Sequence, residues 1–406
     1  MLLKQIIVSI LLLLISSCEL LEQDAGSKKV TGVSFDRHVD SVELDKSIAL
    51  AYSLEPADAD NQTVSWSNSD ETVTLLTSGV VKGLKIGRCR VTIKTADGGF
   101  ADTCQIKVIP RASDVVFIDI PLNWLDFKMG STNGNSAEQP VHAVNFTHPL
   151  KMSVNEITNA QFCNALNYAL EKNLLAKGSD GQLITPQIRN SQGISYPLIN
   201  LTGYYNSQNR CAISYQNGKF TVASGMNSRP VSFVSWYGAA FYCNMLSLQQ
   251  GKTALYDLTK INWPCTAYGI SAYRLPTEAE WEYSASYNDK RIYPWGSGFN
   301  PANANCLENS GSTTNVTSYP GSKLGLYDLA GNVSEWCQDW YYNKYYQDAS
   351  AQQNPVGPAA GTVKVLRGGS WFSAGDFLRC QARDFALPQS MLHDYGFRVV
   401  MVKVVK

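Results

Sequence analysis

Cysteine and histidine side chains are the groups in this sequence best able to hold a soft metal ion or to act as nucleophiles. The chain has ten cysteines and four histidines, the latter at His38, His142, His148 and His393. No two histidines have the spacing of paired metal ligands, and neither an HExxH nor a CxxC motif occurs. A Gly-Lys-Thr triplet at 251–253 lacks the upstream glycine of a phosphate-binding loop. The sequence therefore excludes the commonest zinc and nucleotide sites, and the cysteines remain to be explained.

The composition indicates a folded protein with more than one domain. At roughly 150 residues per domain, the 406 residues give room for two or three domains. A hydrophobic fraction of 44% with 11% aromatic residues supports packed cores. The 34 basic and 34 acidic residues leave no net charge. Because nucleic-acid binding needs a surplus of positive charge, we expect no nucleic-acid partner.

The first residues predict an export signal. Lys4 precedes an apolar run over 6–15, which is too short to span a bilayer but typical of a secretory signal. The run leads into the sequence ISSC, which ends at Cys18 and resembles a bacterial lipobox, where the cysteine becomes the lipidated first residue. We therefore expect a signal peptide at 1–17, a lipid on Cys18 that attaches the chain to a membrane, and a polar tether at 18–29. The expected location is the outer membrane or cell surface of a Gram-negative bacterium. The alternative is an ordinary signal peptide with a chance cysteine.

Residues 30–110 predict an all-β sandwich, because short β-branched runs alternate with turn signals and show no helical periodicity. The order of the phrases VTGVSF, LEPADA, VSWSNSD and GRCRVTI resembles the bacterial Ig-like domain of group 2, which implies a spacer or adhesion module. Cys89 and Cys104 flank a hairpin turn expected near 97–98 and fall roughly opposite each other. Outside the cytoplasm a disulfide between them is expected.

The remainder of the chain, 113–406, predicts a domain of loops and short strands with few helices. Apolar residues at helical spacing predict one helix over 157–170, where Thr158 supplies the cap, and another over 234–250, where Gly251 ends the pattern. A third, short helix is expected after Pro276, with acidic residues in its first turn.

Eight or nine phrases of this domain, in order, resemble the formylglycine-generating enzyme family, also called the sulfatase-modifying factor family. They include FKMGS (127–131), NEITNAQFCNAL (155–166), RLPTEAEWEY (274–283), GLYDLAGNVSEW (325–336), RGGSW (367–371) and YGFRVV (395–400). The resemblance implies a variant of the C-type lectin fold. The fold class expected for the chain is thus α+β with little regular secondary structure, preceded by the all-β Ig-like sandwich.

The chemistry of active family members depends on two cysteine thiolates that hold Cu(I), since soft thiolates select that ion. The matching positions here are Ser373 and Leu378, and neither a hydroxyl nor an aliphatic side chain is a good ligand for Cu(I). Cys380 lies nearby, but a cysteine there is structural in the family pattern. The resemblance therefore implies no copper, no assigned catalytic residue and no catalysis of the family type.

A calcium-binding loop of the family is matched at Asp328, Gly331, Val333 and Glu335, as two side-chain carboxylates and two backbone carbonyls. Oxygen ligands of this kind suit a hard cation, so the resemblance implies bound calcium. The alternative is that the two carboxylates brace the loop without a metal ion.

The segment 372–395 alternates a fixed skeleton with irregular positions, which we call slots. In many relatives the slots hold asparagine, and the Phe, Ser, Asp, Ala, Leu, His and Tyr found here are reachable from an asparagine codon by changing only adenines. This pattern is typical of the target of a diversity-generating retroelement, although Met391 does not fit it; the alternative is drift in a degenerate enzyme. Aromatic and small polar side chains on a rigid scaffold also resemble a paratope. The expected ligand-binding residues are Trp371, Phe372, Ser373, Asp376, Phe377, Asp384, Phe385, His393, Asp394 and Tyr395.

Together these features predict a lipid-anchored surface protein whose large domain binds a protein or glycan ligand without catalysis. Two other functions stay open: an oxidase of the formylglycine-generating type or another family enzyme acting on exported proteins, and a structural subunit of an envelope or secretion machine. With Cys18, Cys89 and Cys104 assigned, seven cysteines remain in the large domain. This odd number leaves at least one of them unpaired within the chain.

Overall fold

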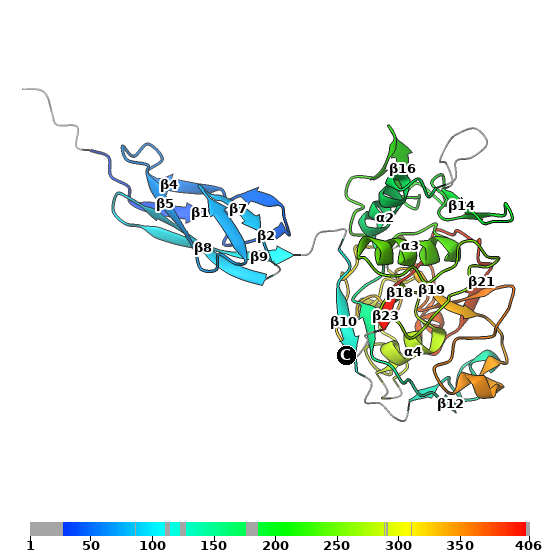
Figure 1. The fold of residues 1–406 in the computed structure, drawn as a ribbon. Coiled ribbons are helices and arrows are strands. Elements are labelled where there is room, and N and C mark those ends of the chain that lie inside the picture. The colour runs from blue at the N-terminus through cyan, green and yellow to red at the C-terminus, as the bar shows by residue number, and fades with distance from the viewer. Residues whose placement is uncertain are drawn as a thin grey trace, which may run out of the picture. The chain divides into compact units, whose positions relative to one another are not determined.

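The computed structural model describes residues 27–402 except 86, 110–113, 122–126, 176–185, 288, 290 and 310. The chain divides into two compact units, Met1–Arg111 and Ala112–Lys406, and each is described here by itself (Figure 1). The predicted signal peptide and Cys18 lie outside the described residues. No helix among the described residues is long and apolar enough to cross a membrane.

The smaller unit is built entirely from strands, as its alternating sequence predicts. A four-stranded sheet has the order β2-β9-β8-β5, a three-stranded sheet the order β3-β7-β6, and β1 pairs with β4. The strands are β1 Gly32–Phe35, β2 Val39–Glu43, β3 Ser47–Ala49, β4 Tyr52–Glu55, β5 Val64–Asn68, β6 Thr74–Thr77, β7 Val80–Gly83, β8 Gly87–Thr95 and β9 Ala101–Ile109. Every second residue of β8 is buried, among them Val91 and Ile93, so one face of the sheet closes on the core.

The expected disulfide of the smaller unit is not formed. Strands β8 and β9 are antiparallel, and their register places Cys89 opposite Ile106 and Cys104 opposite Val91. The two cysteines are therefore diagonal neighbours instead of a directly opposed pair, and diagonal Cβ atoms are farther apart than the roughly 4 Å of a disulfide. Both are buried free thiols, and the Cys89 Sγ lies 3.1 Å from the Thr74 hydroxyl.

Three α-helices occur in the described part of the larger unit: α2 Asn159–Glu171, α3 Trp236–Gln249 and α4 Glu278–Ser286. Each begins at a side-chain cap predicted or permitted by the sequence. The Thr158 hydroxyl accepts a hydrogen bond from the third helical amide of α2, and Ser235 and Thr277 do the same for α3 and α4. Gly251, with φ of +66°, follows α3, as expected for the residue that ends it.

The rest of the larger unit is short strands and single helical turns joined by loops, which confirms the expected α+β class. The strands are β10 Phe117–Ile120, β11 Lys128–Met129, β12 His142–Ala143, β13 Leu150–Ser153, β14 Gln187–Arg189, β15 Ser195–Pro197, β16 Ile213–Gln216, β17 Lys219–Val222, β18 Tyr273–Arg274, β19 Ser334–Trp340, β20 Lys364–Arg367, β21 Asp384–Ala386, β22 Tyr395–Gly396 and β23 Val400–Val402. The helical turns are η1 Ser136–Glu138, η2 Pro301–Asn303, η3 Tyr345–Gln347, η4 Ala349–Ala351 and η5 Gly375–Leu378.

Two four-stranded sheets organise this unit. One has the order β10-β13-β23-β18. In it β10, near the start of the unit, and β23, at the end of the described chain, both pair with β13 (β10 and β23 are labelled in Figure 1). The other has the order β21-β20-β19-β22. Buried tryptophans connect it to α3, since the Trp236 indole donates to the Cys337 carbonyl and the Trp336 indole to the Val234 carbonyl. These contacts bury large apolar rings without leaving their N–H groups unpaired.

Candidate functional site

Helix α4 supplies the charged centre of the larger unit. Its carboxylates Glu278, Glu280 and Glu282 are all buried, although the sequence suggested only a favourable first turn. Each forms an ion pair with a different buried arginine: Glu278 with Arg383, Glu280 with Arg274, and Glu282 with Arg367. A buried carboxylate is tolerated only when a cation and hydrogen bonds compensate it. Arg274 lies only six residues before Glu280, whereas Arg367 and Arg383 are 85 and 105 residues from their partners and fix a distant segment against α4.

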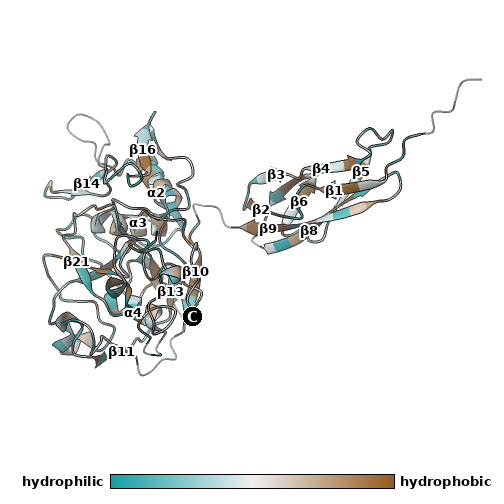
Figure 2. Cartoon of the chain, turned by 180° about the vertical axis from the view of Figure 1, so that it is seen from behind, coloured by the Kyte–Doolittle hydropathy of each residue, from teal (hydrophilic) through white to brown (hydrophobic). Residues whose placement is uncertain are grey.

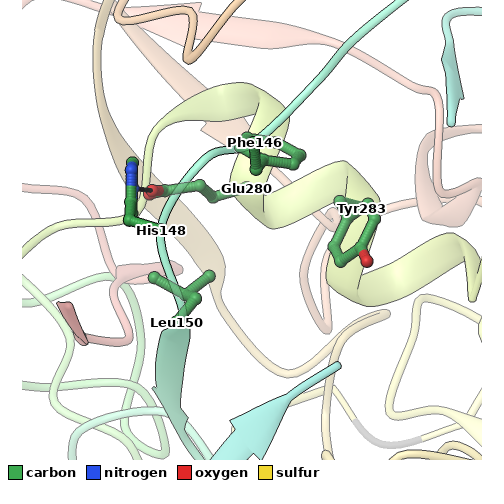
Figure 3. Close-up of a pocket in the computed structure, with 5 residues that line it drawn as sticks. All are labelled: Phe146, His148, Leu150, Glu280 and Tyr283. Atoms are coloured by element: carbon green, nitrogen blue, oxygen red, sulfur yellow. Dashed lines mark hydrogen bonds and ion pairs between the residues drawn. The ribbon is translucent and has the colours of Figure 1, made fainter. Parts of the chain in front are cut away.

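Glu280 is the most densely bonded of the three. Both of its oxygens accept hydrogen bonds from the Arg274 guanidinium, at 2.6 and 2.7 Å, and one also accepts from the Thr277 amide. His148 approaches it at 3.5 Å across a small pocket that Phe146, Leu150 and Tyr283 complete (Figure 3). Burial alone would raise the pKa of Glu280, but attraction to Arg274 and these hydrogen bonds lower it to about 2.

Arginines at both ends hold the segment 368–383, which contains half of the ten predicted ligand-binding residues. Arg367 ends β20, and Arg383 lies directly before β21 with its guanidinium over the rings of Tyr341 and Tyr346. Between them, the Arg379 guanidinium bonds both oxygens of the buried Glu138 at 2.8 and 2.9 Å. The segment is therefore a rigid loop and not a free one, which suits a binding surface.

The structure brings the two positions that correspond to copper ligands together. A Cβ placed on Gly369 would lie 3.2 Å from the Ser373 Cβ and 3.1 Å from a Leu378 methyl carbon, so both side chains meet at this glycine. The Ser373 hydroxyl accepts a hydrogen bond from the Ser370 amide, and Leu378 is fully buried. The pair consists of a hydrogen-bonded hydroxyl and a packed aliphatic group, neither of which supplies a thiolate.

Two cysteines lie near this point, and neither replaces a missing ligand. Cys306 packs in the same apolar cluster as Leu378, a proximity that the sequence did not reveal, and burial raises the pKa of its thiol to about 11. Cys380 packs in a different cluster, with Trp281, and burial raises its pKa as well. Neither cysteine stands at the position of Ser373 or Leu378, so no sulfur occupies the two positions that correspond to copper ligands.

Most predicted ligand-binding residues are accessible. Phe372, Phe377 and Phe385 have exposed fractions of 47%, 55% and 48%. We call these three phenylalanines the aromatic rim. Asp376 and Asp384 are also exposed, and Ser373, His393, Asp394 and Tyr395 are partly exposed. Phe377 lines a small pocket together with Ser373, Asp384, Arg367 and Arg383. The other two rim residues are chain neighbours of Ser373 and Asp384. The pocket volume of about 10 Å³ holds a single water molecule, so recognition must take place on the surface around it.

Trp371 corrects one expectation, because it is only 2% exposed and does not face solvent. Its ring centroid lies 5.4 Å from that of Phe372 and 5.2 Å from that of His393, so the buried Trp371 packs against both of these more exposed rings. Tyr205, which the sequence did not single out, completes this group with its ring 4.0 Å from that of His393. Tyr205 is 45% exposed and therefore extends the accessible aromatic surface. No local signal marks it, since it lies in a loop far from the segment 372–395.

Asp394, a predicted ligand-binding residue that is partly exposed, also makes hydrogen bonds within the fold. Its carboxylate accepts a hydrogen bond from the Ser370 hydroxyl at 2.9 Å, and its carbonyl accepts one from the Ser334 amide. Burial raises the pKa of Asp394, and the nearby His393 opposes this shift. These hydrogen bonds hold Asp394 and the loop that follows RGGSW in position.

Comparison with known proteins identifies the larger unit. A family model described as a sulfatase-modifying factor enzyme 1-like domain matches residues 125–403. The chain belongs to this family. A second model, the bacterial Ig-like domain of group 2, matches residues 29–106.

Relatives of the family unit carry different names. The chain is 34% identical over 300 residues to "Serine/threonine-protein kinase pkn1" of Chlamydia caviae, a match that covers 72% of this chain and 39% of that protein. It is 28% identical over 302 residues to the formylglycine-generating enzyme of Streptomyces coelicolor, covering 67% of this chain and 85% of that enzyme. The chain thus spans only about two fifths of the length of the Chlamydia relative.

Two solved structures share the fold. "Treponema denticola variable protein 1" superposes with a TM-score of 0.52 at 23% identity, covering 77% of this chain and 99% of that one. PvdO from Pseudomonas aeruginosa gives a TM-score of 0.50 at 21% identity, with coverages of 73% and 100%. These likenesses confirm the C-type lectin-like architecture expected for this family.

In the loop that the family resemblance assigns to calcium, an arginine already pairs with one of the two carboxylates. Both Glu335 oxygens accept hydrogen bonds from the Arg398 guanidinium, and one also accepts from the Trp281 indole. Asp328, in contrast, accepts one hydrogen bond, from the Thr317 amide, and burial raises its pKa to about 6. An ion held by this set would have to draw Glu335 away from Arg398. Within the part of the chain that the structure describes, no group of three or more His, Cys, Asp or Glu side chains is arranged as a metal site.

A third carboxylate, which the sequence did not suggest, lies beside this loop. Glu156 is fully buried and accepts hydrogen bonds from the Asn332 amide side chain and the Val333 backbone amide. Burial, together with the charges of Asp328 and Glu335, raises its pKa well above the usual range. Glu156 thereby shapes the backbone of the loop, which supports the alternative that acids brace it.

Proposed function

We propose that the larger unit is a binding module without catalysis, displayed at the cell surface by a lipid on Cys18. The observation that carries this proposal is the pairing of Ser373 and Leu378 at Gly369, where active members of the family hold copper. The site lacks the two soft ligands that the redox chemistry of the family requires. A Cys18→Ala variant that stays in the membrane fraction would contradict the lipid anchor.

The chemistry of the surface around this point favours a protein ligand over a glycan. The aromatic rim consists of phenylalanines, and the neighbouring Leu387 and Leu392 are 49% and 47% exposed. None of these five side chains has a polar tip to pair with sugar hydroxyls, and they outnumber the two exposed carboxylates of the surface, Asp376 and Asp384. Large exposed apolar residues on a rigid loop are instead typical of the buried centre of a protein–protein interface.

The distribution of buried and exposed residues supports diversification of this surface. The twelve slots of 372–395 that match the asparagine pattern are all exposed or partly exposed. Of the skeleton positions, Cys380, Ala382, Arg383 and 396–398 are buried, whereas Ala374 is exposed and Gly375 and Arg379 are partly exposed. If the slots are free to vary, substitutions at the slots should leave the fold intact. Substitutions at the buried skeleton positions should destabilise it.

Loss of the aromatic rim is expected to abolish selected binding. Peptides enriched from a random phage-displayed library against the soluble chain starting at Glu19 should bind the wild type. They should bind a Phe372→Ser/Phe377→Ser/Phe385→Ser variant at least tenfold more weakly, because the rim supplies the apolar contact area. A matched variant, Leu75→Ser/Val80→Ser, removes exposed apolar residues from the smaller unit and should bind normally.

Two outcomes would contradict the proposed function. Enriched peptides that bind the rim variant as tightly as the wild type would place the ligand site elsewhere. Tight Cu(I) binding by the wild type, with oxidation of a cysteine-containing sulfatase peptide, would show that the chain is an oxidase in spite of Ser373 and Leu378.

Calcium at the loop of Asp328 and Glu335 is a separate proposal, supported by the family resemblance and by the buried Asp328 carboxylate, which accepts a hydrogen bond from the Thr317 amide and is not paired with Arg398. Calcium at a hundred times its Kd is expected to stabilise the wild type by about 3 kcal/mol. An Asp328→Asn variant should gain nothing. Thermal unfolding with calcium or with EGTA measures this effect, and equal melting temperatures of the wild type in both would exclude the ion.

A further inference from the structure

The outer face of the sheet β2-β9-β8-β5 in the smaller unit concentrates positive charge. On β8, Arg88, Arg90 and Lys94 occupy every second or fourth position and are exposed, and Lys107 of β9 is exposed as well. They alternate with buried residues such as Val91, so their side chains leave the sheet on the side opposite the core. Figure 2 shows hydrophilic and hydrophobic segments along β8. We call these four residues the basic face.

The register sets the spacing of these charges. Arg88 lies directly opposite Lys107, and Arg90 lies opposite Gln105. With a rise of about 3.4 Å per residue, Arg90 follows Arg88 by about 7 Å and Lys94 follows Arg90 by about 14 Å. The charges therefore form an extended row along β8 and not a single point.

Little within the unit neutralises the basic face. None of its four residues forms an ion pair with another residue in the described part of the chain. The one acid at an outward position of these four strands is Glu43, which pairs with Ile109 at the end of the sheet. The even spacing of Arg88, Arg90 and Lys94 along β8 places them on one face, and the pairing of β8 with β9 adds Lys107 to it.

Between the cations the basic face is polar and lacks aromatic rings. Its outward positions include Ser65, Ser67, Thr92, Thr103 and Gln105. A shallow depression of about 430 Å³ lies beside Arg88 and Arg90 and is also lined by Ser69 and Gln105. Cations that alternate with hydroxyl and amide groups match a ligand in which anionic groups alternate with hydroxyls.

We propose that the basic face binds an anionic polysaccharide, independently of the ligand of the larger unit. The guanidinium and ammonium groups would pair with its carboxylate or sulfate groups, and the hydroxyl and amide side chains would bond its sugar hydroxyls. A single-stranded nucleic acid fits less well, because bases need aromatic side chains to stack on. A lipid surface also fits less well, because Val39 is the one large apolar residue exposed at an outward position among the side chains that the structure describes on these strands.

Binding of the soluble chain starting at Glu19 to heparin and to polygalacturonate tests this proposal. An Arg88→Gln/Arg90→Gln variant is expected to bind both at least tenfold more weakly than the wild type, with a smaller dependence on salt. A Lys94→Gln/Lys107→Gln variant should lose affinity in the same way. The matched control, Lys46→Gln/Lys82→Gln, removes two exposed lysines outside the basic face and should bind as the wild type does. Unchanged melting temperatures establish that all three variants are folded.

Three outcomes would overturn the proposal. A control variant that loses as much affinity as the arginine variant would reduce the effect to net charge. Neutral dextran that binds as tightly as the anionic chains would exclude recognition of charge. Vesicles containing phosphatidylglycerol that bind more tightly than either polysaccharide, and that lose affinity for the arginine variant, would assign the face to a membrane.

Discussion

A Glu280→Gln variant is expected to unfold with a free energy about 3–5 kcal/mol lower than the wild type at pH 7. The substitution leaves the Arg274 guanidinium, which is 1% exposed, without its carboxylate in the interior. It also removes the charge that the Thr277 amide bonds at the start of α4. Urea unfolding followed by tryptophan fluorescence measures the change, since every tryptophan except Trp66 lies in the larger unit.

The loss should depend on pH in a defined direction. The pKa of Glu280 is lowered from 4.5 to about 2 in the folded chain. A lowered pKa stabilises the folded state above the unfolded value, and this contribution disappears as the pH falls from about 4.5 to about 2. The shift corresponds to about 3 kcal/mol. The difference between variant and wild type should therefore be large at pH 7 and much smaller near pH 2.

A matched variant separates this effect from a general loss of charge. Glu171 ends α2 and is exposed, so a Glu171→Gln change is expected to stay within about 0.5 kcal/mol of the wild type at either pH. A Glu280→Gln penalty that is the same at pH 7 and at pH 2–3 would show that the Glu280 charge does not stabilise the fold.

The second large effect is a contrast between skeleton and slots. An Arg383→Met change removes two hydrogen bonds to the buried Glu278, at 2.7 and 2.8 Å, and is expected to cost about 3–5 kcal/mol of unfolding free energy. The aromatic-rim variant changes three exposed residues and should cost about 1 kcal/mol or less. Part of that cost comes from Phe385, whose ring stacks on Tyr341 at 4.4 Å.

The rim variant is expected to keep most of its stability and to lose its ligand. Arg383→Lys keeps the charge but not the two-pronged geometry, so its stability should lie between those of Arg383→Met and the wild type. If the rim variant were as unstable as Arg383→Met, the slots would be structural. The diversified surface would then have to be abandoned in favour of ordinary drift.

Local sequence carried much of the fold. The cap at Thr158, the short α4 after Pro276 and the end of α3 before Gly251 depend on residues within one or two turns, and all were predictable. The alternation of buried and outward residues along β8 was equally local. The pairing of Cys89 with Ile106 was not, because a shift of two positions in register leaves the pattern of faces unchanged.

Composition and motif order by themselves determined the domain classes, the family and the replacement of both copper ligands by Ser373 and Leu378, because each depends only on which residues occur and in what order. Only the tertiary structure decided that Trp371 is buried and that the rings of Tyr205 and His393 are in contact. It also decided that Arg398 forms hydrogen bonds with the Glu335 carboxylate. The same holds for the acids of α4, whose partners are up to 105 residues away in sequence. The physical reason is that burying a charge or a large ring is favourable only where segments distant in sequence supply its partner, and no local pattern names that partner.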